Sequence, residues 1–321
     1  MMRKNYHLKR IKMMQKTQLR GVLILCLTAV IWGSAFVTQS MGMESVEPFT
    51  FNGVRMLIGA AALLPVILVR DAFSARMAGS PTKEQTREAN KKALRRGAFM
   101  GLALCAASNC QQFAFLYSQP GKIAFITAFY MFFVPFFGLF LGKRVPALTW
   151  GCVAAGIVGL YFLCVADTGF SGINLGDVLT LICAMLFSVH ILLTERVAAD
   201  SDTIKLSCVQ FAVCGAISCG LMFLFESPSA AALGECWFPL LYTGVLSCGV
   251  AYTLQVVGQK YTESTVASLI LCTESVFGVL SSALILHERM TANEIVGCSV
   301  MFAAIVVSQL ADRIPLRTKG K

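Results

Sequence analysis

One carboxylate lies within a stretch that is otherwise apolar, small or hydroxylated: Glu274 in LILCTESVFGVL, residues 269–280. A carboxyl group with apolar surroundings resists ionisation unless a cation lies close to it. Such a group can exchange a proton, or it can bind an amino group. The alternative is a structural glutamate that hydrogen-bonds an opposing helix or pairs with Arg55. Glu274 is therefore the first candidate for binding or proton transfer.

Arg55 and Trp32 are the next two residues that could bind a solute. A guanidinium can hold a carboxylate through two parallel hydrogen bonds. Arg55 could instead extend its side chain towards the nearer surface or pair with a helix C-terminus. Trp32 lies in the middle of an apolar run, whereas tryptophan in membranes favours the interface. It could stack on a solute or serve only in packing.

Amides and hydroxyls form a third group of candidates within apolar segments: Ser108, Asn109, Gln111, Gln112, Thr127, Tyr130 and Gln255. We expect four of them to bind a polar solute, namely Asn109, Gln112, Tyr130 and Gln255. Hydrogen bonds between helices are the alternative use of such groups. His190 is expected to be an interfacial residue near the end of its apolar segment.

The sequence contains none of the common cofactor or metal patterns. The 13 cysteines include no C-x-x-C pair, and no histidine is spaced to complete a zinc site with them. We interpret them as small, soft residues at helix contacts. No Walker or dinucleotide-binding glycine pattern occurs, and no paired carboxylates stand at catalytic spacing. We therefore expect no cofactor, no metal and no enzymatic activity.

The elements that must position these residues are transmembrane helices. Hydrophobic residues make up 56% of the 321 residues and charged residues only 14%, whereas soluble domains carry about 25% charged residues. A spanning helix needs about 20 mostly apolar residues. Ten stretches meet this need: residues 19–40, 48–69, 96–117, 122–141, 147–165, 174–194, 204–225, 237–257, 264–286 and 292–311. The sequence predicts an all-α membrane protein with ten transmembrane helices.

The basic residues predict the orientation. Of the 27 Lys and Arg residues, all except Arg55, Lys122 and Arg289 fall on one side of a ten-span arrangement. Loops rich in Lys and Arg stay in the cytoplasm, so both termini are predicted to be cytoplasmic. The charge of +10 is thus a topology signal that can also contact anionic lipid, and we expect no nucleic-acid partner.

Two halves of the chain resemble one another. LGKR (141–144) and LHER (286–289) each follow a small and Leu-rich run, and placing Lys143 opposite Glu288 aligns the two charged turns. Five spans per half is an odd number, so the second half is predicted to be inverted, with a substrate site where the halves meet. Gln210 then matches Arg55 approximately. Pro135, inside the fourth span, is a candidate hinge.

Several motifs resemble those of the EamA-type transporters of the drug/metabolite transporter superfamily. They are IWGSAFV (31–37), EPFTFNGVR (47–55), AFYMFFVPFFGLFLGKR (128–144) and LCTESVFGVLSSALILHER (271–289). The resemblance covers residues 19–312. The chain departs from the family pattern at Lys143, where a glutamate is usual, and at Ser275, where proline is frequent. The resemblance implies two inverted five-helix repeats and export of small metabolites, often amino acids.

These observations predict the organisation of the chain: a basic tail over 1–18, a first repeat over 19–167 with a cytoplasmic loop at 70–95, an inverted second repeat over 168–312, and a basic tail over 313–321. The predicted function is export of a small polar or amphipathic metabolite by a monomer in the plasma (inner) membrane, with Glu274 as the candidate for proton coupling. Export of cationic drugs, or a membrane enzyme or scaffold, are the alternatives.

Overall fold

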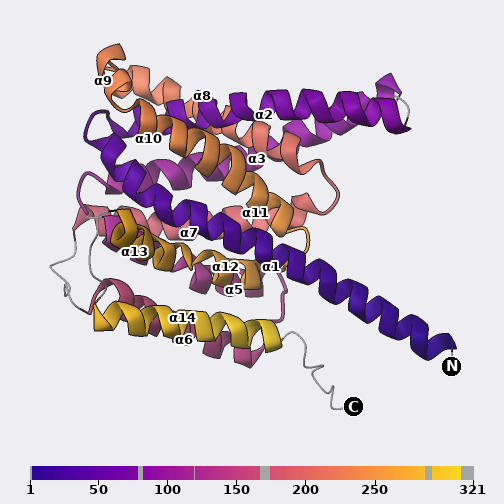
Figure 1. The fold of residues 1–321 in the computed structure, drawn as a ribbon. Coiled ribbons are helices and arrows are strands. Elements are labelled where there is room, and N and C mark those ends of the chain that lie inside the picture. The colour runs from indigo at the N-terminus through magenta and orange to yellow at the C-terminus, as the bar shows by residue number, and fades with distance from the viewer. Residues whose placement is uncertain (1, 79–81, 119, 167–173, 286–290, 312–321) are drawn as a thin grey trace.

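The computed structural model describes residues 2–78, 82–118, 120–166, 174–285 and 291–311 (Figure 1). Every regular element in these residues is helical. In chain order they are α1 (Met2–Met43), α2 (Pro48–Ala78), α3 (Lys83–Ala114), α4 (Pro120–Thr127), α5 (Tyr130–Phe140), α6 (Ala147–Cys164), α7 (Leu175–Ala198), α8 (Thr203–Phe225), α9 (Ala230–Glu235), α10 (Trp237–Leu241), the π-helix η1 (Tyr242–Tyr252), α11 (Thr253–Gly258), α12 (Ser264–Leu271), α13 (Glu274–Ile285) and α14 (Ala292–Ala311).

Six helical segments of the described chain are long and apolar enough to cross a bilayer: Gln18–Met43, Pro48–Met77, Pro120–Phe140, Leu175–Ala198, Thr203–Phe225 and Trp237–Gly258. Three shorter apolar helices cover Ala147–Phe162, Ser264–Gly278 and Ile295–Val307. Each of the ten apolar stretches predicted from the sequence coincides with one helix or with consecutive helices. The all-helical fold class is therefore confirmed.

Local sequence signals fix where several helices begin. Thr82 and Gln85 form a reciprocal capping box at the start of α3, and Asn174 and Asp177 do the same for α7. Asp202 accepts hydrogen bonds from two backbone amides in the first turn of α8. Each cap satisfies amide groups that the helix itself leaves unpaired, so the chain turns are defined before any tertiary packing.

Two segments are interrupted at equivalent positions. The eight-residue helices α4 and α12 are each followed by a two-residue break, after which α5 begins at Tyr130 and α13 at Glu274. Neither break contains proline or glycine. Helix α5 continues through Pro135, so the interruption lies ahead of the proline that the sequence indicated as a hinge. Both breaks keep local backbone hydrogen bonds of the 3₁₀ type, such as Phe129 N to Ile126 O at 3.2 Å and Thr273 N to Ile270 O at 3.1 Å, so each break is a local tightening of a helix that continues through it.

Helices α2 and α8 pack together in opposite directions. At one end, Lys205 in α8 pairs with Asp71 in α2 at 2.8 Å. At the other end, Glu226 just after α8 accepts a 2.7 Å hydrogen bond from the Thr50 hydroxyl in α2. Thr50 and Lys205 are separated by the same number of positions as Asp71 and Glu226. The two ends of this contact are therefore equivalent.

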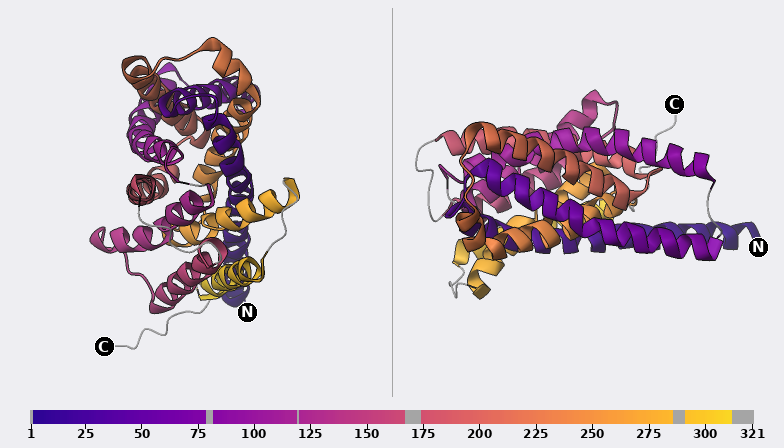
Figure 2. Two further views of the ribbon diagram at one scale, coloured as in Figure 1. Left: turned by 90° about the vertical axis from the view of Figure 1, so that its left-hand side faces the viewer. Right: turned by 90° about the horizontal axis from the view of Figure 1, so that it is seen from above.

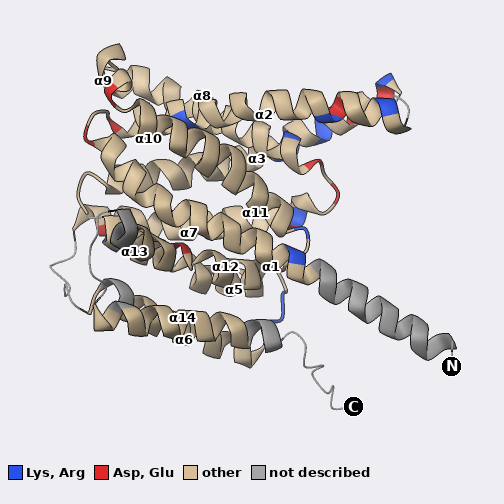
Figure 3. Cartoon of the chain, viewed as in Figure 1, with Lys and Arg blue, Asp and Glu red and all other residues tan. Residues whose placement is uncertain are grey.

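The long helices lie with their axes roughly aligned (Figure 2). α1 packs between the α12–α13 segment and the η1–α11 segment, α7 packs against α3, α4 and α5, and α6 pairs with α14. The hairpin of α2 and α3 and the start of α1 both extend beyond the other helices at the same end of the molecule, and Figure 1 shows them apart from one another. Lys and Arg gather at this end of the molecule (Figure 3). We name it the basic end, and the end where α1 meets α2 the far end.

Candidate functional site

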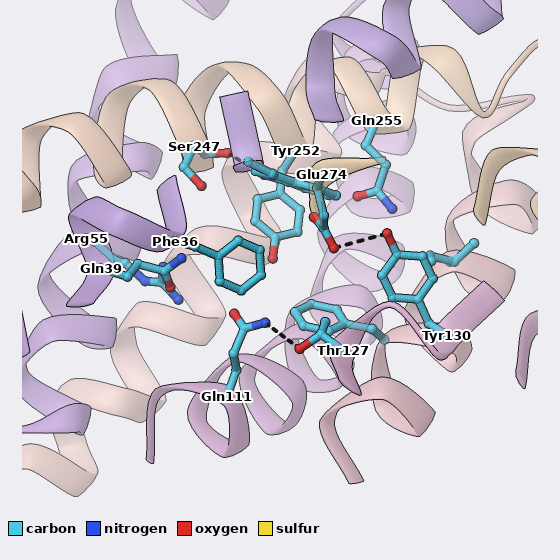
Figure 4. A pocket seen from close by; sticks show the side chains of 13 residues that line it. Phe36, Gln39, Arg55, Gln111, Thr127, Tyr130, Ser247, Tyr252, Gln255 and Glu274 are labelled. Atoms are coloured by element: carbon cyan, nitrogen blue, oxygen red, sulfur yellow. Dashed lines mark hydrogen bonds between the residues drawn. The ribbon is translucent and has the colours of Figure 1, made fainter. Parts of the chain in front are cut away.

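A central cavity lies between the helices of the two halves. Its volume, counted as the space open to the centre of a water-sized sphere, is about 40 Å³, which is room for a few water molecules. The residues that line it are Trp32, Phe36, Gln39, Arg55, Gln111, Thr127, Tyr130, Phe187, Ile191, Ser247, Tyr252, Gln255 and Glu274 (Figure 4). Aromatic and polar side chains thus face the same space.

Pairs of residues at equivalent positions line this cavity. Tyr130 and Glu274 are 144 positions apart, and Gln111 and Gln255 have the same separation. That separation also relates the starts of α4 and α12 and the ends of α3 and α11. Each half therefore contributes the same helix positions to one cavity.

The first two helices of each half follow a second separation. α1 ends at Met43 and α7 at Ala198, a difference of 155 positions (198 minus 43), and the starts of α2 and α8 differ equally. With this separation, Trp32 corresponds to Phe187 and Phe36 to Ile191, and all four line the cavity. Two apolar pairs and two polar pairs of the lining are thus matched, whereas the other lining residues, Gln39, Arg55, Thr127, Ser247 and Tyr252, have no counterpart in the lining.

Glu274 begins α13 directly after the break that follows α12. Its side chain is buried, and Oε1 accepts a hydrogen bond of 3.1 Å from the Tyr130 hydroxyl (Figure 4). The N-terminus of a helix carries partial positive charge and favours a carboxylate. This placement stabilises the charged group, while the low-polarity surroundings destabilise it. The buried Glu274 carboxylate can therefore bind a proton or an amino group, which takes the place of the water that would solvate it at the surface.

Arg55 is fixed by other side chains. Nε and Nη2 donate to Asn52 Oδ1 at 3.1 and 2.9 Å, and Nη1 donates to Gln39 Oε1 at 2.5 Å. Asn52 in turn donates to Asn109 Oδ1 at 2.9 Å. A guanidinium has five N–H donors, so donors remain that can bind a carboxylate. Of the ion pairs among described residues, none joins Arg55 to Glu274.

Trp32 is held at the cavity wall by a polar and an aromatic contact. Its Nε1 donates to the Ser247 carbonyl at 3.3 Å, and its ring meets Tyr252 edge-on at 4.5 Å between centroids. Two χ angles fix an aromatic ring at low entropic cost, and the edge-to-face arrangement adds to the packing energy. A flat apolar face is thus available to a solute.

The structure brings together five of the seven residues that the sequence suggested: Trp32, Arg55, Tyr130, Gln255 and Glu274. Asn109 and Gln112 are not among the residues that line the cavity. Asn109 belongs to the hydrogen-bonded group behind Arg55. Gln112 is fully buried, and neither atom of its amide has a partner in the described part of the chain.

Gln111 and Thr127 line the cavity and hydrogen-bond one another at 3.2 Å. Helical geometry turns adjacent residues by about 100°, so Gln111 and Gln112 cannot face the same space. The separation of 144 positions, applied to Gln255, would have selected Gln111. Aligning Lys143 with Glu288 gives a separation that is one position longer. Applied to Gln255, that separation selects the residue before Gln111 instead.

His190 does not lie at an interface, contrary to the sequence interpretation. Its side chain is fully buried, and Nε2 lies 2.9 Å from Gln210 Oε1. Helix α7 is at the centre of the bundle, so its side chains are covered by other helices. Helix α3 packs along it, and Gln210 of α8 contacts His190. Glu288 and its turn lie outside the described residues.

Comparisons with known proteins agree with this geometry. The sequence profile of the EamA-like transporter family matches residues 19–165 and 174–309. An "Uncharacterized transporter" of Archaeoglobus fulgidus is 28% identical over 295 residues, which are 89% of this chain and 84% of that one. The "Uncharacterized transporter YoaV" of Bacillus subtilis is 22% identical over 288 residues, covering 87% and 93% of the two chains.

A solved structure, titled "Crystal structure of protein", superimposes with a TM-score of 0.74 at 19% identity. The match covers 93% of this chain and 98% of that chain, and at this identity it shows a shared fold. The two family matches together span most of the sequence, one on each half. This chain is a multi-pass membrane protein with two EamA-like domains, and it belongs to the EamA-like transporter family.

Proposed function

We propose that the protein is a secondary transporter that exports a small metabolite carrying an amino and a carboxyl group, an amino acid or a close relative. In this mechanism Arg55 orients the carboxylate, and Glu274 holds the amino group or exchanges a proton. Trp32, Tyr130 and Gln255 complete the contacts, and Asn109 supports Arg55 through Asn52. Gln112 stays a sequence prediction.

We propose further that ten helices cross the membrane as inverted five-helix repeats over residues 19–167 and 168–312. The equivalent ends of the α2–α8 contact support this inversion, because two antiparallel equivalents imply a two-fold axis in the membrane plane. The basic end would then be cytoplasmic, with both termini there. One chain contains both repeats, which supports a monomer, and the plasma (inner) membrane is the proposed location.

One observation carries the proposal: matched polar residues from both halves face one cavity beside two interrupted helices. Substrate sites of secondary transporters lie at the interface between the two repeats. Rocking the halves about such a site exposes it to either side in turn. Export of a cationic drug is the less favoured alternative, because Arg55 places a positive charge in the same cavity.

The test is a metabolite profile of the medium around cells that overproduce the protein. Wild type is compared with Glu274→Gln, which keeps the shape of the side chain but loses its charge. Glu263→Gln is the matched control, since Glu263 is exposed and lies outside the cavity. All three proteins are brought to equal membrane levels.

We expect one class of amino acid to accumulate with wild type and with Glu263→Gln, and at least about tenfold less with Glu274→Gln, a loss of about 1.4 kcal/mol. Equal accumulation with all three would assign Glu274 a structural role. An unchanged medium in every case would remove export and leave import or a membrane enzyme or scaffold.

A further inference from the structure

Buried polar side chains continue from the cavity towards the basic end. His190 in α7 and Gln210 in α8 are both fully buried and contact one another at 2.9 Å. His190 Nδ1 and Gln210 Nε2 have no hydrogen-bond partner within the described part of the chain. Buried polar atoms nearly always have partners in proteins, so these two groups indicate a ligand or solvent contact.

Helix α11 links this pair to the cavity. Gln255 lines the cavity, and Gln259, one turn further, donates to the Ile191 carbonyl at 2.9 Å. The Oε1 atoms of both glutamines have no partner in the described chain. Tyr252, another cavity residue, has its ring 6.2 Å from that of His190. The unpaired groups thus begin at the cavity wall.

Ser207 extends the same series towards the basic end. It precedes Gln210 by three residues on α8, which places both on one helix face. It is fully buried, and its hydroxyl has no partner among described residues. Ser207 lies four residues, about 6 Å, from the start of α8 at Thr203. Only one helical turn separates it from the charged residues of the basic end.

The repeat gives this pair a counterpart. Gln210 is 155 positions after Arg55, the separation that relates α2 to α8. Arg55 contacts Gln39 of α1, and Gln210 contacts His190 of α7. Each half therefore joins its second helix to its first through a buried polar contact, although the partners on the first helices differ in position, since Gln39 corresponds to Thr194 and His190 to Ala35. The pair near the far end carries a formal charge, whereas the Gln210–His190 pair consists of hydrogen-bonding groups.

We propose that Gln210 and Ser207 line the inner part of the solute route, between the cavity and the basic end, with His190 beside the cavity where this route begins, and that all three bind the polar groups of the passing solute by hydrogen bonds. The ligand class is an amine, hydroxyl or carboxyl group of the transported molecule. This inference rests on the proposed transport function. Residues that only closed the cavity off from water would be apolar, because burying polar groups without hydrogen-bond partners costs free energy.

The first arm of the test needs no solute. Ser207→Cys is made together with Cys208→Ser, which moves one thiol by one position. The purified protein in lipid nanodiscs is treated with 2-aminoethyl methanethiosulfonate, a small, water-soluble thiol reagent. Mass spectrometry then compares the labelling rate of the thiol introduced at position 207 with that of Cys214. Cys214 is the internal control, since it lies on the same helix and is as buried as Ser207.

The second arm measures export of whichever amino-acid class wild-type cells release. Gln210→Leu removes the amide at similar size. Thr180→Val is the matched control, because Thr180 is fully buried on α7, ten residues from His190, and its hydroxyl donates to the Gly176 carbonyl of its own helix. Melting temperatures of both variants are recorded, so that a folding defect is recognised.

We expect the thiol at position 207 to react at least tenfold faster than Cys214. We expect Gln210→Leu to raise the half-saturating internal concentration at least fivefold, while Thr180→Val does not. Equal labelling rates would overturn the route. Fast labelling together with unchanged export by Gln210→Leu would show a water-filled passage without solute contact and would overturn the binding role. Because labelling needs no transported solute, it stays informative if the metabolite profile identifies none.

Discussion

At the residue scale, the contact between Tyr130 and Glu274 joins equivalent positions of the two halves. Equivalent residues meet where a two-fold axis passes between them. Two glutamates at such a point would repel one another or share a proton. A phenol opposite a carboxylate avoids this conflict, because one donates and the other accepts. The two halves therefore carry different residues at the position where two identical residues would be most unfavourable.

Arg55→Gln gives the first half the residue that the second half has at Gln210. Glutamine is uncharged, so the cavity loses its cation but keeps a polar group. We expect the half-saturating concentration of a carboxylate-bearing solute to rise at least about tenfold, about 1.4 kcal/mol. Transport of the corresponding amide should change much less. Initial rates in proteoliposomes with acid and amide forms measure this difference, and equal losses for both forms would contradict carboxylate binding.

Both charged members of the site, together with Trp32 and Tyr130, could be predicted from the sequence, whereas the lining residues Phe36, Phe187, Tyr252 and Ser247 were missed. Arg55 and Glu274 are conspicuous because charges are rare in apolar segments. Buried amides could not be assigned in the same way, since a glutamine can face a cavity or another helix with equal ease. The choice between Gln111 and Gln112 depends on which face of α3 meets the cavity, and the alignment of Lys143 with Glu288 selects neither of them. An alignment displaced by one residue turns a helix position by about 100°.

At the element scale, α1 approaches the break before α13 through Gly33. A Cβ atom at this position would lie 2.6 Å from the Glu274 carbonyl oxygen and 2.7 Å from the Gly278 nitrogen. Both neighbours are backbone atoms and cannot rotate away. We expect Gly33→Ala to cost about 1–3 kcal/mol by forcing α1 and α13 apart, and to impair export because Glu274 moves with α13.

Gly151→Ala is the control for that change. Gly151 is exposed on α6, and a Cβ atom there meets no other atom within 4 Å. Alanine favours a helix over glycine by about 0.5–1 kcal/mol, so this variant should melt at the wild-type temperature or slightly above it. Thermal unfolding in detergent compares the two variants. Equal melting temperatures would show that α1 and α13 can separate without loss.

Two ion pairs fasten the α4–α5 segment of the first half to α7 of the second. Lys143, at the basic end, contacts Glu195 and donates to Ser264 at 3.0 Å. Lys122, at the other end of α7, pairs with Asp177 at 2.7 Å. Partly exposed pairs contribute little to stability, about 0–1 kcal/mol. Their positions at opposite ends suit them to opening one end at a time.

We expect Lys143→Met to increase amide hydrogen exchange near Ser264 and the end of α7, and to leave the start of α4 unchanged. Lys122→Met should have the opposite pattern. The exchanged pair Lys143→Glu with Glu195→Lys should restore the wild-type pattern, because the attraction is regained. Hydrogen–deuterium exchange with mass spectrometry measures all three. An equal increase at both ends of α7 in either variant would exclude separate opening.

The interruptions of the α4–α5 and α12–α13 segments could not be predicted from local sequence. Apolar runs of the right length predicted one continuous helix each, and Pro135 drew attention to a position inside α5. The breaks arise from tertiary packing, in which the two segments meet at Tyr130 and Glu274. Hydrophobic runs, cap residues and charged turns are local signals and predicted the helix positions well. A break without proline or glycine has no such signal.

At the scale of the whole molecule, charge and repeat give the same orientation. Lys and Arg gather at the basic end, and the equivalent ends of the α2–α8 contact imply that the second half is inverted. The proposed five spans per half would require this inversion, because an odd number of spans ends on the other side of the membrane and two such halves return the chain to its starting side. The orientation of each half is thus coupled to the orientation of the other.

This coupling predicts the outcome of reporter fusions in a bacterial host. Green fluorescent protein joined to the C-terminus should fluoresce, because it folds in the cytoplasm, where the basic end is expected. Alkaline phosphatase inserted after Ser229, an exposed residue between α8 and α9, should be active, because it needs the oxidising side of the membrane. Exchanging the two reporters should silence both, which controls for expression. Activity of both reporters at one position would mean that the protein inserts in mixed orientations. Activity in the exchanged positions alone would place the basic end outside the cytoplasm. It would also reverse the direction assigned to the solute route past Gln210.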